Sequence, residues 1–116
     1  MSIPPSLNAL IEQLNQEIAQ IDEDATVGLS LVRDFLARFP DNARLIQFFA
    51  SFSNAILFAE IERRRIQSIL VNLTFVEQLT DAERQEVGED LSNELGKVLE
   101  TKIIVSTLKQ RLENLQ

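Results

Sequence analysis

Residues 45–61 of this chain read LIQFFASFSNAILFAEI, and the run from Leu45 to Leu79 contains neither proline nor glycine. A run of this length favours a helix, because the residues that usually end helices are absent. Nine of its apolar residues point in nearly every direction around such a helix: Leu45, Ile46, Phe48, Phe49, Phe52, Ile56, Leu57, Phe58 and Ile61. A helix that is apolar on all sides must be covered on all sides. The sequence therefore predicts a long central helix over 42–79.

The start and the continuity of this central helix rest on polar residues. Asp41 follows Pro40 and can cap the first turn, because its carboxylate accepts hydrogen bonds from unpaired backbone amides. Serine and asparagine side chains at 51, 53 and 54 compete for the backbone hydrogen bonds that a helix needs. A break near 51–54 is therefore the alternative to one continuous helix.

The residues before the central helix predict two shorter helices. Pro4-Pro5-Ser6 is typical of a helix start, since proline fits the first turn and the Ser6 hydroxyl can cap it. The apolar residues that follow step by four and three, which is the spacing of one helix face: Leu7, Ile11, Leu14, Ile18 and Ile21. The acidic run 22–24 ends that pattern. We therefore expect helices over 7–21 and 26–39, the second ending before Pro40.

The C-terminal third begins with the clearest boundary in the chain. Thr80 and Glu83 have the spacing of a capping box, in which each side chain accepts a hydrogen bond from the other residue's backbone amide. Apolar residues at helical spacing then predict helices over 81–95 and 97–115, separated at Gly96. The chain of 116 residues is thus expected to form one all-α domain, a four- or five-helix bundle.

The amino-acid composition excludes most catalytic mechanisms. Because the chain has no cysteine and no histidine, it lacks thiolate ligands, the commonest metal ligand and the usual neutral-pH general base. We expect no catalytic residue, no cofactor, no small-molecule ligand and no enzymatic activity. An oxygen-only site for Mg²⁺ or Ca²⁺ stays open, because hard cations accept carboxylates alone. The acidic residues at helical spacing that would supply it are Glu83, Glu86, Glu89, Asp90 and Glu94.

The charge and the segment lengths indicate the compartment. A net charge of −7 repels nucleic acid at long range and favours solubility. The first residues lack the basic and apolar regions of a signal peptide, so we expect a cytoplasmic protein. The most apolar stretch, residues 45–59, is shorter than the roughly 20 residues that a membrane span requires. No membrane partner is expected.

One dense basic cluster, Arg63, Arg64 and Arg65, supports an alternative function. Guanidinium groups bind phosphates, so these residues would be the contacts of a nucleic-acid-associated regulator. Adjacent helical residues splay about 100° apart, and Glu60 with Arg64 has the spacing of an ion pair. We therefore favour a salt-bridge role for the cluster.

The leading functional hypothesis follows from the all-round apolar central helix. One chain has few other helices to cover it, so a second copy is expected to do so in a two-fold dimer through the central or the C-terminal helix. The expected interface residues are Phe48, Phe52, Ile56 and Ile61. The chain would then act as a non-enzymatic interaction, adaptor or scaffold protein that binds itself and an unidentified protein. A closed monomeric bundle is the competing hypothesis.

Overall fold

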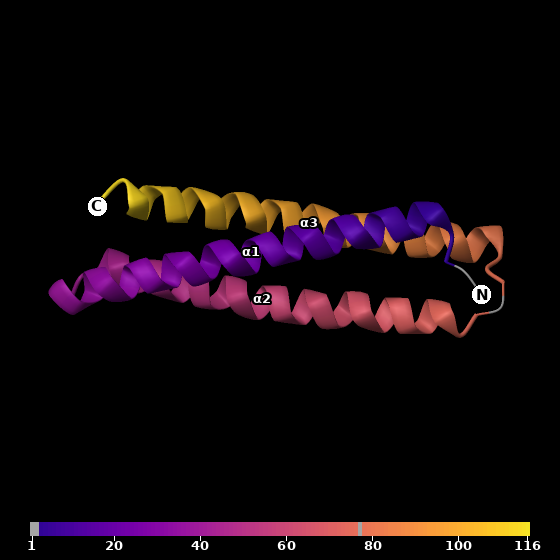
Figure 1. Ribbon diagram of the computed structural model, residues 1–116, viewed down its shortest axis with the longest axis horizontal. Coiled ribbons are helices and arrows are strands. Elements are labelled where there is room, and N and C mark those ends of the chain that lie inside the picture. Colours follow the sequence, from indigo (N-terminus) through magenta and orange to yellow (C-terminus); the bar gives the residue numbers. More distant parts are fainter. Residues whose placement is uncertain (1–2, 77) are drawn as a thin grey trace.

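The computed structural model describes residues 3–76 and 78–116, and these residues form three long helices. The helices are α1 (Pro5–Arg38), α2 (Ala43–Thr74) and α3 (Asp81–Glu113). Figure 1 shows that α2 runs back along α1 and that α3 then returns in the direction of α1. The result is a rod of 58 × 19 × 17 Å. The expected all-α fold is confirmed.

The expected number of four or five helices is wrong, because the two predicted breaks and the alternative break near 51–54 do not occur. The helices expected over 7–21 and 26–39 are one helix, and so are those expected over 81–95 and 97–115. The third break, near 51–54, lies inside the continuous helix α2. Fewer and longer helices therefore make the rod.

A seven-residue apolar repeat runs through the predicted breaks. In α1 the buried positions continue beyond Ile21 at steps of four and three through Ala25, Gly28 and Val32. Such a repeat keeps one seam of a long helix against its neighbours. The acidic run 22–24 remains helical beside this seam, because Asp22 pairs with Arg63 of α2 (3.5 Å) and Asp24 pairs with Lys109 of α3 (3.1 Å).

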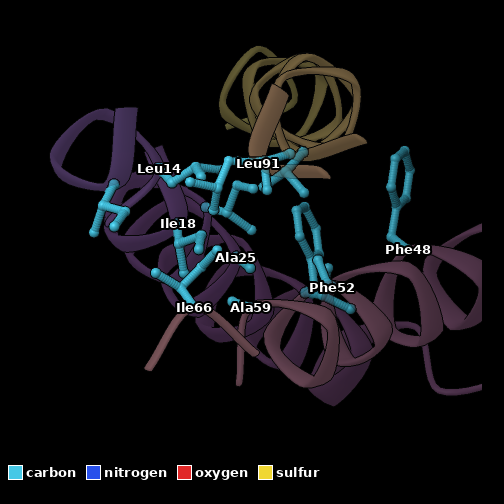
Figure 2. Close-up of a cluster of buried hydrophobic side chains, with 14 of the residues drawn as sticks. Leu14, Ile18, Ala25, Phe48, Phe52, Ala59, Ile66 and Leu91 are labelled. Atoms are coloured by element: carbon cyan, nitrogen blue, oxygen red, sulfur yellow. The ribbon is translucent and has the colours of Figure 1, made fainter. Parts of the chain in front are cut away.

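The central helix of the bundle is α1 rather than α2, which corrects the arrangement expected from the sequence. Both α2 and α3 pack along α1, and they contact each other far less than either contacts α1. The core lies where seams from all three helices meet. Figure 2 shows Leu14 and Ile18 of α1, Phe52 and Ile66 of α2, and Leu91 of α3 gathered there.

The turns use polar caps. The predicted capping box is confirmed, since the Thr80 hydroxyl accepts from the Glu83 amide and the Glu83 carboxylate accepts from the Thr80 amide, both at 3.1 Å. Asn42, rather than Asp41, caps α2 by accepting from the Leu45 amide at 3.0 Å. At α1 the cap residue is Pro4, and Ser6 lies inside the helix. Asn42 and Thr80 thus start α2 and α3 with satisfied backbone donors.

Phe52 of α2 packs directly over Gly28 of α1. The Phe52 side chain is completely buried, and a Cβ atom added at Gly28 would overlap its ring. Glycine normally weakens a helix interior. Its presence in α1 is explained by the space that the Phe52 ring requires.

We expect Gly28→Ala to destabilise the protein by about 1 to 2 kcal/mol, although alanine is the better helix former. The Phe52 ring is completely buried, so the added methyl group forces it to shift within a packed core. Gly96→Ala is the matched control, since no atom lies within 4 Å of its added Cβ, and it should stabilise the protein by about 0.5 to 1 kcal/mol. Chemical denaturation measures both variants. Equal stabilisation by both changes would contradict the proposed packing constraint.

Candidate functional site

The apolar seam is interrupted by two glutamates that face each other across α2 and α3. Glu62 is 3% exposed and Glu94 is 9% exposed, and each occupies a position of its helix's seven-residue repeat. Buried carboxylates are costly unless they are paired or neutralised. Their surroundings therefore decide what this site does.

Two basic side chains cover the pair. Arg65 places Nη1 3.0 Å from Oε1 of Glu94 and 3.5 Å from Oε1 of Glu62. Lys97 places Nζ 3.5 Å from the same Glu94 oxygen. The Oε2 atoms of both glutamates are buried and have no hydrogen-bond partner within the part of the chain that the structure describes. A proton held between the two carboxyl groups would satisfy these oxygens.

The pKa values of the two glutamates are shifted in opposite directions. Burial raises the pKa of Glu62 to about 7, with further contributions from its hydrogen bond to Glu94 and from the charge of that residue. The hydrogen bond from Glu62 is the main reason that the pKa of Glu94 is lowered. The pair therefore holds one proton at mildly acidic pH and loses it as the pH rises through about 7, with Glu62 as donor and Glu94 as acceptor.

The other acidic candidates do not join this pair. Glu83, Glu86, Glu89 and Asp90 are exposed on α3, while Glu94 points into the core. Among residues 3–76 and 78–116, no group of three or more acidic side chains is arranged to hold a metal ion. The sequence singled out Glu94 but missed its pairing with Glu62. The sequence feature that could have revealed the burial of Glu62 is its spacing. Glu62 lies three residues after Ala59 and four before Ile66, and both of these residues belong to the buried seam of α2.

The three arginines of the basic cluster are separated by their ion pairs. Arg63 pairs with Asp22 and Glu60, and Arg64 pairs with Glu60. Arg65 turns toward the buried glutamates. Three guanidinium groups engaged in different directions do not form one phosphate-binding surface.

The four expected interface residues lie in different environments. Phe48 and Phe52 are buried in the chain's own core, and their rings stack at a centroid distance of 6.5 Å. Ile56 is partly buried against that core. Ile61 alone is exposed. Of the four, Ile61 is therefore the residue with the largest surface open to a partner.

The side of α2 opposite the core carries an apolar strip that we call the outer stripe, made of Ile46, Ala50, Leu57 and Ile61. At 100° per residue these four side chains lie within about 60° of one another. The composition and length of α2 would also suit a membrane span, although a third of the relevant window is buried. The apolar residues that suggested all-round coverage are thus divided between the core and the outer stripe.

Comparison with models of protein families, with curated proteins and with solved structures finds no match to this chain. We therefore infer its function from its own residues.

The buried pair predicts how stability depends on pH. The raised pKa of Glu62 means that the folded chain keeps this proton to higher pH than the unfolded chain, so stability falls as the pH rises from 5 to 8. Glu62→Gln can donate the same hydrogen bond and cannot ionise. We expect it to reduce this fall by about 1 to 2 kcal/mol.

Denaturation midpoints at pH 5 and pH 8 measure the effect. Glu60→Gln is the control, because Glu60 is an exposed carboxylate two positions away on the same helix. It should leave the pH dependence intact. An unchanged pH dependence in Glu62→Gln would disprove the shared proton.

Proposed function

We propose that this chain is a non-enzymatic interaction protein that acts as a homo-oligomer, with the outer stripe of α2 as its dimer surface. The observation that supports the proposal is the stripe itself. Exposed apolar residues that gather on one side of a helix commonly mark an interaction site. Apolar residues that are exposed singly are common on protein surfaces and would not indicate an interface.

The order of residues in the outer stripe suits a two-fold axis. In an antiparallel pair of α2 helices, Ile46 of one copy would meet Ile61 of the other, and Ala50 would meet Leu57. A two-fold interface requires this self-complementarity, because the same patch serves both copies. The small residues Ser53 and Asn54 fall at the centre, where they would let the two helices approach closely.

Two other functions have weaker support. In an adaptor role, a different protein would bind the outer stripe. This role differs from the proposed dimer only in that the bound partner is not a second copy of the chain. A nucleic-acid regulator would use Arg63, Arg64 and Arg65, whose ion pairs would have to break before they contact phosphates. The acidic net charge opposes that function at long range.

Leu57→Glu tests the dimer surface without damage to the core, since Leu57 is 58% exposed. The unaltered chain should sediment with a mass that rises from 13.2 kDa toward twice that value over the micromolar range. Over the same micromolar range Leu57→Glu should remain near 13.2 kDa, because a charge within an apolar interface loses its hydration.

Ile103→Glu provides the matched control. Ile103 is exposed on α3, so the same chemical change occurs away from the outer stripe and should leave the dimer intact. A concentration-independent mass of 13.2 kDa for the unaltered chain would support the closed monomer instead.

A further inference from the structure

An apolar pocket lies at the end of the rod that contains the turn between α1 and α2. Its volume is about 560 Å³, within the range of pockets that bind ligands. The apolar wall includes Phe35, Phe39 and Phe48 from the first two helices and Leu115 from the C-terminal residues. Phe39 and Leu115 are more than half exposed, so this apolar surface is open to solvent.

Two arginines also line this pocket, and we call it the arginine-lined pocket. Arg44 and Arg111 are exposed, and neither forms an ion pair with any residue in 3–76 or 78–116. The surrounding segments, 26–57 and 108–116, carry five basic and three acidic residues, whereas the rest of the chain carries six basic and fifteen acidic residues. The pocket therefore suits a partner with an apolar anchor and negative charge.

The opposite end of the rod has those properties. Phe75 ends α2 and is 82% exposed, more than any other large apolar residue described. Residues 78–90, beside it in the turn and at the start of α3, carry five acidic residues against the single base Arg84. A second groove at this end is lined by Glu83, Glu86 and Asp90. We call this region the acidic end.

We propose that copies of this chain associate end to end, with Phe75 at the acidic end of one copy docked in the arginine-lined pocket of the next. Docking would bury an exposed ring and would give Arg44 and Arg111 acidic partners. The two contacting surfaces differ, so the interface is heterologous and each copy keeps one free end. The association can therefore extend into chains, and it uses a surface separate from the outer stripe.

Complementary variants test the proposal in full-length Leu57→Glu protein, which removes the contribution of the outer stripe. The pocket variant combines Arg44→Glu with Arg111→Glu, and the acidic-end variant carries Phe75→Asp. Each variant alone should stay monomeric by sedimentation, because it retains only one functional surface. An equimolar mixture should form a complex of two copies and no larger species, since the pocket variant donates Phe75 to the intact pocket of the other.

The Leu57→Glu parent should stay monomeric in the micromolar range and should form species larger than two copies as its concentration rises from there toward about 1 mM. Its association should weaken about tenfold when salt increases from about 0.05 M to about 0.5 M, because salt screens the ion pairs. Arg64→Glu and Ile103→Asp in the same parent are controls for loss of positive charge and of exposed apolar surface, and both should leave association unchanged. Circular dichroism establishes that every variant is folded.

Three results would overturn the proposal. The first is a parent that stays monomeric up to about 1 mM, which would leave less than about 4 kcal/mol for the end-to-end contact. The second is a mixture of the two variants that does not associate. The third is a small amphiphilic anion or a different protein found by native mass spectrometry in the pocket of the purified chain, because it would be the occupant in place of a second copy. None of these results bears on the dimer of the unaltered outer stripe.

Discussion

The contact between Phe52 and Gly28 is the constraint on which the arrangement of the helices depends. The large ring of α2 lies directly on the backbone of α1, at the one buried position of α1 that has no side chain. A larger residue at 28 would push α2 away from α1, and a smaller residue at 52 would leave a void. Since Phe52 has no exposed surface, the fit leaves little freedom for α2 to slide or rotate.

The sequence revealed the helical class and the boundary at Thr80, but not the lengths of the helices. Large apolar residues are easy to recognise at helical spacing, whereas the seams of α1 and α2 pass through Ala25, Gly28, Ala55 and Ala59. Small residues in these positions look like interruptions, although they permit close packing. The acidic run after Ile21 similarly looked like a helix end, because its ion pairs to distant residues are visible only in three dimensions.

The buried pair of Glu62 and Glu94 was hidden for a related reason. A polar residue adjoins each glutamate in the sequence, Arg63 after Glu62 and Asn93 before Glu94, which is typical of an exposed face. Only the seven-residue spacing of the buried positions places each glutamate inside. An interior polar contact of this kind adds little stability compared with apolar packing. Its best-attested role is to fix register, since sliding either helix by one turn would bury each carboxyl group alone. The surfaces at the outer stripe and at both ends therefore keep fixed positions along the rod.

The unequal packing of the three helices also has a consequence for local motion. Because α2 and α3 each pack on α1 and contact each other little, either of them can open while the other remains attached. The amides of α1 become accessible to water only when both partners have separated from it. Hydrogen exchange should therefore be slowest in α1, and the interior of this helix should report the free energy of global unfolding.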